Sequence, residues 1–259
     1  MNSKEPFDIA LSIAAAGRYA ECIRAADEML RTDPRHPVLL TLKAICLEAQ
    51  GNVGEGRRIA AEAIRSIQFT DPDQKVEIAE DCRHVTDRFL PEHPSNVSLL
   101  MVLAAAQYHL QEADSCLSAC RMLIGKDKSN VWGWLYKGYA HAAQQVWDKA
   151  LEAYQKASEI DPCNPDAWWN LGACANAFGQ LTLNPKLHEK AIEACKKALA
   201  LEPNRPEAHY NIGIANASLR KHREGLLALR KAKDMNPSPQ LLVAIDHAIR
   251  VCESEMQAT

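Results

Sequence analysis

The chain has 259 residues, a hydrophobic content of 47% and a formal net charge of −3. This composition suits a folded protein, and its nearly balanced charge does not indicate a nucleic-acid partner. Residues 1–6 lack the basic and apolar regions of a signal peptide, and the longest apolar run, 97–106, is too short to span a bilayer. We therefore expect a cytoplasmic or nuclear protein that does not insert into a membrane.

Residues 1–96 contain two irregular helical hairpins and one further helical segment. The first hairpin covers 3–36 and ends at Asp33-Pro34, with a turn at Gly17. The second covers 37–70, with a turn at Gly51, and lacks the closing proline. Apolar residues at helical spacing in both halves of each hairpin indicate pairs of packed helices.

The segment 71–96 departs from the hairpin pattern. Asp71-Pro72 predicts a helix start, and Pro91 and Pro94 predict its end. The residues between them carry an apolar stripe, so the segment is either one long helix or a shortened repeat. It is the best candidate for a bend or a boundary, and its sequence does not distinguish a rigid bend from a flexible link.

Residues 97–239 repeat one pattern in four blocks: 97–130, 131–164, 165–205 and 206–239. The last three blocks have a glycine at the eighth position, and each ends in an acidic or polar residue followed by proline. The glycines are Gly138, Gly172 and Gly213. Small residues at this spacing let two antiparallel helices approach closely, and the proline ends the unit. A fixed period of this length predicts an all-α stack of hairpins rather than a single globular core.

Two motifs connect these blocks with a known family. Trp168-x2-Leu171-Gly172 and Ala150-x3-Tyr154, followed by Pro162, resemble the tetratricopeptide repeat (TPR) family. The resemblance covers the last three blocks well and the N-terminal hairpins poorly. It implies a right-handed α-α superhelix whose concave wall is built from the first helix of each hairpin.

Two C-terminal features fall outside the regular pattern. The block 165–205 has surplus residues between Gln180 and Ala191. Asn184-Pro185 can start an extended second helix, and Leu181 and Leu183 are apolar residues in the loop expected before it. Such an insertion is either a contact site or simply tolerated, and both readings stay open. The helix expected from Pro239 to Glu253 has one apolar face, which predicts a cap on the last hairpin. The alternative is a helix that docks on a partner.

No catalytic motif is present in the sequence, so we expect a protein that is not an enzyme and needs no cofactor. Glycine-rich phosphate loops, G-x-S-x-G and H-E-x-x-H are all missing. Cys116-x3-Cys120 and Cys82-x-His84 each offer two metal ligands, but no second pair stands at zinc spacing, so no metal site is predicted. Cys22, Cys116, Cys120 and Cys195 fall on helix-packing positions, which favours buried free thiols.

The resemblance also implies which side chains line the groove: the second, fifth, sixth, ninth and twelfth residues of each repeat. The predicted groove residues are Trp132, Tyr136, Tyr139, Asp166, Trp169, Asn170, Asn176, Glu207, Tyr210 and Asn211. Exposed rings in a concave wall are typical recognition anchors. The amides of Asn170 and Asn211 can bond a peptide backbone through both a donor and an acceptor, although Asn is common at this position across the family.

The groove pattern differs from that of repeats that clamp the C-terminal carboxylate of heat-shock chaperones. That clamp needs Lys and Asn where this chain has Leu135 and Tyr139, and Lys and Arg where it has Glu207 and Asn211; only Asn170 fits. Asp166 and Glu207 would repel an acidic tail. We therefore expect a neutral-to-basic peptide or helix of a partner protein, with apolar anchors.

The main functional prediction is a scaffold or adaptor that binds its partner in the groove. One alternative is a structural subunit that packs through its convex face or its ends. Another is a recognition module that acts with a separately encoded enzyme. RNA binding is disfavoured because Asp166 and Glu207 make the predicted groove acidic.

Overall fold

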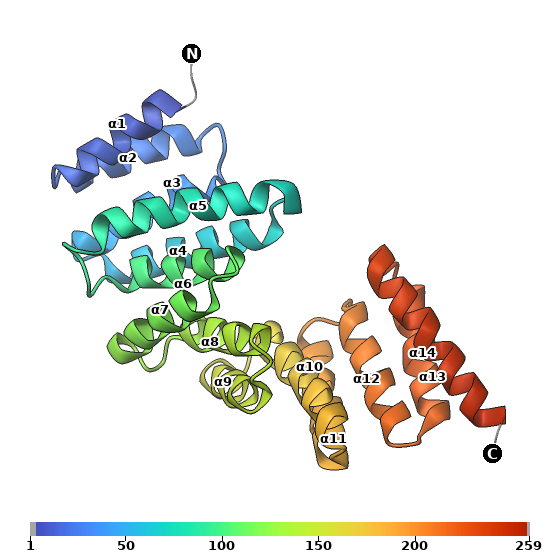
Figure 1. Cartoon of the computed structure of the whole chain (residues 1–259). Helices are drawn as coiled ribbons and strands as arrows, with labels where there is room; N and C mark the ends of the chain where they lie inside the picture. Colours follow the sequence, from blue (N-terminus) through green and yellow to red (C-terminus); the bar gives the residue numbers. More distant parts are fainter. Residues whose placement is uncertain (1–3, 258–259) are drawn as a thin grey trace. The chain divides into compact units, whose positions relative to one another are not determined.

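The computed structural model describes residues 4–257, and this part of the chain consists of α-helices joined by short turns (Figure 1). None of its helices is long and apolar enough to cross a membrane. The helices are α1 (Lys4–Ala15), α2 (Tyr19–Leu30), α3 (Pro37–Ala49), α4 (Val53–Phe69), α5 (Pro72–Phe89), α6 (Val97–His109), α7 (Ala113–Lys126), α8 (Val131–Ala143), α9 (Trp147–Ile160), α10 (Pro165–Thr182), α11 (Pro185–Leu201), α12 (Pro206–Ser218), α13 (His222–Asp234) and α14 (Pro239–Gln257).

The chain divides into two compact units, Met1–Ala140 (unit 1) and His141–Thr259 (unit 2). The division falls within α8, inside one sequence repeat, so the repeats and the compact units are different descriptions of the chain. In unit 1, α3 packs against α4, and α6 packs against α7. In unit 2, α10 pairs with α11, and α12 pairs with α13. The predicted all-α stack of hairpins is confirmed.

The hairpins of unit 2 close at glycines, as the sequence pattern predicts. A Cβ atom added to Gly172 would overlap Sγ of Cys195 on α11 and lie 3.1 Å from the carbonyl oxygen of Ala191. A Cβ atom added to Gly213 would lie 2.5 Å from Cγ of Leu229 on α13. The separations from Sγ of Cys195 and from Cγ of Leu229 are both far below van der Waals contact, so the helices can lie this close only because positions 172 and 213 have no side chain.

Two tryptophans fix the turns that precede successive first helices in the same way. The indole nitrogen of Trp134 donates to the carbonyl oxygen of Lys128 at 2.9 Å, and that of Trp168 donates to Pro162 at 2.8 Å. A lysine ammonium lies over each ring: Lys137 over Trp134 and Lys197 over Trp168. Each ring therefore ties the turn before its helix to the helix that carries it.

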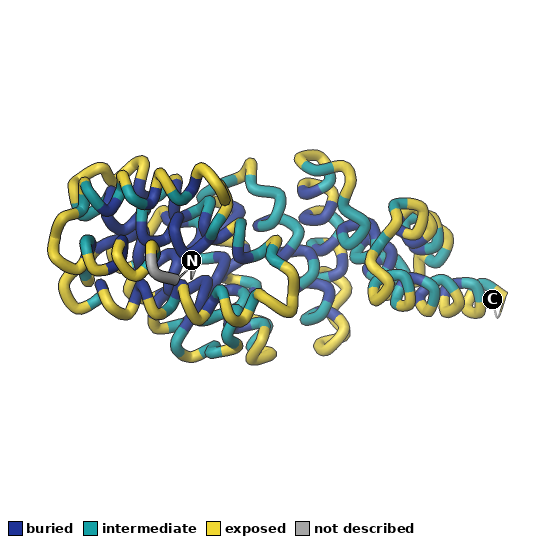
Figure 2. The backbone as a smooth tube through the Cα atoms, turned by 90° about the horizontal axis from the view of Figure 1, so that it is seen from above, coloured by how far each residue is buried: buried dark blue, intermediate teal, exposed yellow. Residues whose placement is uncertain are grey.

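The segment 71–96 is a single helix inside unit 1, not a link between the two units. The side chain of Asp71 accepts a hydrogen bond from the backbone N–H of Asp73 at 3.0 Å, and the helix begins with proline, as predicted. α5 packs against both α3 and α6 (Figure 1). Figure 2 shows buried positions gathered in the interior of the part of the chain that contains the N-terminus. The sequence is compatible with a long helix or a shortened repeat, and the structure shows the long helix.

The surplus residues of the block 165–205 lengthen two helices. The extended second helix that begins at Asn184-Pro185 is confirmed, and the loop expected before it is only a short turn at residues 183–184. α10 continues to Thr182, and the side chain of Asn184 accepts a hydrogen bond from the backbone N–H of Lys186 at the start of α11. Leu181 lies in the last turn of α10, and Leu183 ends that helix in the left-handed conformation with φ 53°. Both leucine side chains are exposed.

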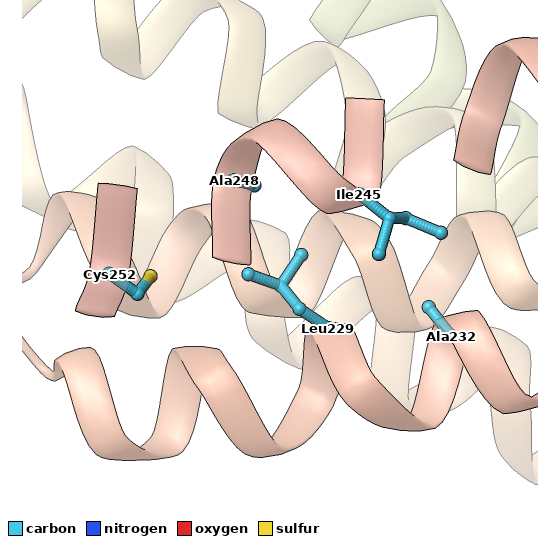
Figure 3. Packing of buried hydrophobic residues seen from close by; sticks show 5 residues of the cluster. All are labelled: Leu229, Ala232, Ile245, Ala248 and Cys252. Atoms are coloured by element: carbon cyan, nitrogen blue, oxygen red, sulfur yellow. The ribbon is translucent and has the colours of Figure 1, made fainter. Parts of the chain in front are cut away.

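The C-terminal helix covers the last hairpin, as predicted. Leu229 and Ala232 of α13 pack against Ile245, Ala248 and Cys252 of α14 (Figure 3). These residues are buried, so the apolar face of α13 is not exposed to water.

Most cysteines of the described chain likewise serve packing: Cys163 is exposed and the others are buried, including those predicted at packing positions.

The close approach at Gly172 predicts a site-specific loss of stability. Gly172→Ala should lower the free energy of unfolding by about 1–3 kcal/mol because its methyl group meets Cys195 and the backbone of α11. Gly125→Ala is the matched control, since a Cβ atom there meets nothing within 4 Å and alanine is the better helix former. Urea unfolding followed by circular dichroism measures both. Equal midpoints for the two variants would contradict the proposed role of the glycine.

Candidate functional site

The predicted groove residues of unit 2 lie on α10 and α12. Asp166 and Trp169 share one partner, Arg205. The guanidinium Nη2 of Arg205 lies 2.7 Å from Oδ1 of Asp166 and 2.7 Å from Oε2 of Glu202, and its Cζ lies 5.2 Å from the centre of the Trp169 ring. The Arg205 side chain is 16% exposed. Arg205 therefore compensates part of the charge of Asp166 and shares its own charge with Glu202, which weakens the predicted repulsion of an acidic ligand without removing it.

The asparagines of α10 mainly serve the fold. Asn176 is 3% exposed; its Nδ2 donates to the carbonyl oxygen of Asn211 at 2.7 Å, and its Oδ1 lies 3.0 Å from Nδ1 of His188. It thus joins α10 to α11 and α12. Asn170 is 7% exposed, and its Nδ2 donates to the carbonyl oxygen of Asp166 within the same helix. The amides of Asn170 and Asn176 are therefore buried and bonded internally, whereas Asn211, the other amide expected to bond a peptide, is half-buried.

A cavity of about 520 Å³ opens on the side of unit 2 where the first helices lie. We call it the unit 2 groove. It is lined by Gln180, Tyr210, Ile214, Ala217, Ser218, Arg220, His222, Ala244, His247, Ala248, Val251 and Glu255, from the end of α10, from α12 and the turn after it, from the start of α13, and from α14. Of the predicted site residues, the structure places Tyr210 in this wall. Its pKa is raised by burial.

The polar rim of the unit 2 groove carries balanced charge. Arg220 and Glu255 are its two charged residues, and His222 and His247 add imidazoles. Arg220 sits in the turn before α13 with φ 59°, which turns the chain back on itself. Its guanidinium has no ion-pair partner within the described residues. The groove therefore combines an apolar floor with a few hydrogen-bonding groups, which is the usual composition of a ligand site.

The predicted rings of unit 1 form a packed cluster. Tyr136 is fully buried and Trp132 is 8% exposed, so the expectation that these two rings are exposed is wrong. Tyr139 is half-buried and stacks on Tyr108 of α6 at 5.2 Å between ring centres. The hydroxyl oxygen of Tyr136 accepts a hydrogen bond from Nε2 of Gln68 at 3.4 Å. The rings hold α8 to α6 and to the end of α4.

The same cluster contains a half-buried histidine, His109. Nε2 of His109 is buried and has no hydrogen-bond partner within the described chain. Burial, with a smaller contribution from the charge of Lys75, lowers the pKa of His109 to about 4. The histidine is therefore neutral at physiological pH and acts as a packing residue.

Sequence reasoning missed the contribution of α14 to the groove. The apolar face of this helix predicts only a cap, although the helix begins at Pro239, as α10 and α12 begin at Pro165 and Pro206. If α14 is counted as the first helix of a further repeat, its groove-facing side chains can be predicted. Arg205 was missed because it precedes α12 in a turn, where no repeat position identifies it. Leu181 and Leu183 are not among the groove-lining residues.

Comparison with known proteins identifies the repeats. Residues 138–174 and 188–219 match the family model described as TPR repeat. These two stretches are tetratricopeptide repeats. The resemblance predicted from Trp168-x2-Leu171-Gly172 is thus confirmed. A relative, Protein bimA of Emericella nidulans (strain FGSC A4), is 27% identical over 73 residues. This TPR-containing chain spans 9% of that protein, and the match covers 28% of the chain itself.

Solved structures share the fold. MamA superposes with a TM-score of 0.55 at 21% identity, covering 64% of this TPR chain and 95% of MamA. TTC0263, a thermophilic TPR protein of Thermus thermophilus, gives a TM-score of 0.52 at 21% identity, covering 67% and 92% of the two chains. YrrB, described as a TPR protein with an unusual peptide-binding site, gives 0.53 at 14% identity, covering 86% and 98%. At these identities the likeness shows the fold alone.

The bonding of Asn176 predicts a stability role for a residue of the expected groove. Asn176→Ala should lower the free energy of unfolding by about 2 kcal/mol, because His188 and the carbonyl of Asn211 lose a buried partner. Asn216→Ala is the control, since the Asn216 amide donates only to the carbonyl of Ile212 in its own helix. Chemical unfolding curves decide between the roles, and a harmless Asn176→Ala variant would show that the amide is free for a ligand.

The lowered pKa of His109 predicts a pH-dependent loss of stability. Between pH 6.5 and about pH 4 the unfolded chain binds a proton that the folded chain does not, so the free energy of unfolding falls as the pH falls through this window. Comparing wild type with His109→Leu in urea at a series of pH values measures this term. Between these pH values the free energy of unfolding of the variant should fall by up to about 3 kcal/mol less than that of wild type. Parallel pH profiles would contradict the lowered pKa of His109.

Proposed function

We propose that this TPR chain is a non-catalytic scaffold or adaptor that binds a peptide or helix of a partner protein. The observation that carries the proposal is the unit 2 groove, an open cavity on the first-helix side of the repeats. Ile214, Ala217 and Val251 supply apolar wall, and Tyr210 supplies an aromatic ring. Stacked repeats commonly use this side for recognition. YrrB, a TPR protein of the same fold, is described as having an unusual peptide-binding site, which supports peptide binding as a function of such a chain.

The ligand proposed for the groove is neutral to basic and has apolar anchors. The lining itself has one arginine and one glutamate, so the preference for a basic ligand rests on Glu207 of α12, which does not line the cavity and has no ion-pair partner within the described residues. An apolar side chain that enters between α12 and α14 would displace water from Tyr210 and Val251. The cation pattern that clamps chaperone tails is missing from the sequence, so an acidic C-terminal tail should bind poorly.

A second candidate is a structural subunit that packs through its outer surface. Leu227 of α13 is 73% exposed and Val243 of α14 is 69% exposed. Single exposed apolar residues are common on soluble proteins, so these residues support the candidate less strongly than the cavity supports the groove.

A peptide selection tests the groove directly. A displayed random peptide library is selected on the wild-type chain, and the enriched peptides are titrated by calorimetry against wild type, Ile214→Glu and Tyr210→Ala. Ile214→Glu should weaken binding at least tenfold because it places a charge on the groove floor. Leu227→Ala, a truncation of an exposed residue outside the groove, is the control.

The composition of the selected peptides provides the second result. Enriched sequences should carry apolar residues beside neutral or basic ones, and a peptide with an acidic C-terminal tail should bind more weakly. Unchanged affinity of both groove variants, with their circular dichroism spectra intact, would reject the groove. A stronger effect from Leu227→Ala would favour the structural-subunit alternative.

A further inference from the structure

The helix α5 occupies part of the first-helix side of unit 1. It packs against α3 and α6, which are the first helices of their hairpins. The Oγ1 atom of Thr41 on α3 lies 3.6 Å from Sγ of Cys82 on α5, and Arg83 pairs with Glu112 at 2.7 Å. α3 and α6 are consequently buried around most of their surface. The side that is open in unit 2 is thus largely filled in unit 1 by the chain itself.

A cavity of about 540 Å³ remains beside α5, bounded on its other side by α1. Its floor is apolar: Leu11 of α1 and Val38 and Leu39 of α3 reach it while being 6%, 3% and 3% exposed. α5 forms one wall through Asp81, and the end of α2 contributes the adjoining edge. The volume is sufficient for one or two large side chains of a ligand.

The rim of this cavity is acidic. Asp8, Asp33 and Asp81 line it, and among the residues whose side chains the structure describes neither lysine nor arginine does. Asp8 and Asp81 have no ion-pair partner within the described chain, and Asp33 accepts a hydrogen bond from the backbone N–H of Arg35. Elsewhere in unit 1 acidic side chains do find cations, as in the pairs Lys43–Asp27 at 2.5 Å and Arg57–Asp127 at 2.9 Å. The cavity therefore presents three carboxylates around an apolar floor.

The neighbouring charged groups do not cancel this rim. His36 and His84 also line the cavity; Nδ1 of His36 accepts a hydrogen bond from the backbone N–H of Leu39. Arg31 and Arg35 are close to Asp33 in sequence but are not part of the lining. The carboxylates thus face a space in which a ligand can supply the missing positive charge.

We infer that this cavity of unit 1 is a second binding site, for a basic segment of a partner protein that carries an apolar side chain. The apolar side chain lies on Leu11, Val38 and Leu39, and flanking lysine or arginine side chains reach Asp8, Asp33 and Asp81. Burial of the apolar group supplies affinity, and the carboxylates select basic flanks and speed association. The inference concerns unit 1 alone and does not depend on the unit 2 groove.

Fluorescence anisotropy of the full chain with labelled peptides tests the site. The probe is a peptide in which lysine and leucine alternate; one counterpart has glutamate in place of lysine, and another has serine in place of leucine. Asp8→Asn/Asp81→Asn removes two rim charges, and Glu77→Gln/Glu80→Gln removes two charges from exposed positions of α5 that do not line the cavity. The rim variant should bind the lysine–leucine probe five- to tenfold more weakly, while the control changes less than about twofold.

Further results distinguish this site from general attraction and from the unit 2 groove. Both counterpart peptides should bind more weakly than the probe, and added salt should weaken probe binding. The weaker probe binding of the Asp8→Asn/Asp81→Asn variant, which we call the rim effect, should persist when the chain also carries Ile214→Glu. Failure of wild type to bind the probe, equal losses in the rim and control variants, tight binding of the lysine–serine peptide, or loss of the rim effect in that background would each overturn the inference. The last outcome would leave the proposed function of unit 2 standing.

Discussion

The close approach of paired helices is the constraint on which the rest of this structure depends. At Gly172 the helix α10 meets Cys195 and the backbone of α11, and at Gly213 α12 meets Leu229 and the backbone of α13. Any side chain at these points would push the helices apart. The close approach keeps each hairpin thin. The next hairpin can then stack on it, and the first helices of successive hairpins lie on the same side. The unit 2 groove is a consequence of that spacing, since its walls are first helices in contact.

The fold could be predicted from the sequence because its signals are local and repeated. Gly172, Gly213 and the prolines that begin α10 and α12 each act within one hairpin, so one period identifies all of them. The groove could not be predicted to the same extent. Asn176 occupies a groove position in the repeat count, yet its amide bonds His188 and the carbonyl of Asn211. Which of two neighbouring surfaces a polar side chain serves depends on the partner helices, and no single repeat contains that information.

The aromatic residues illustrate the same limit. Trp132 and Tyr136 stand at groove positions, but the inserted helix and the end of α4 change what those positions face in unit 1. Gln68 donates to the Tyr136 hydroxyl, and the side chain of Lys75 at the start of α5 donates to the carbonyl oxygen of Gln68. Lys75, which lies outside the repeats, thus holds Gln68 in place, and Gln68 in turn helps to bury Tyr136, which lies within a repeat. In unit 2, where no such helix is inserted, Tyr210 stays half-buried and lines a cavity.

The inserted helix α5 therefore accounts for the main difference between the units. α3 and α6 have apolar residues around their whole circumference, which would be unfavourable on an open groove wall. The apolar side of α5, with Ala79, Cys82 and Phe89 buried, covers them as an amphipathic ligand helix would. What remains open is the space between α5 and α1, and its carboxylates come from elements that a regular repeat would not bring together. One insertion thus fills the usual recognition side of unit 1 and leaves a different cavity, whose rim is acidic, whereas the charges that line the unit 2 groove are balanced.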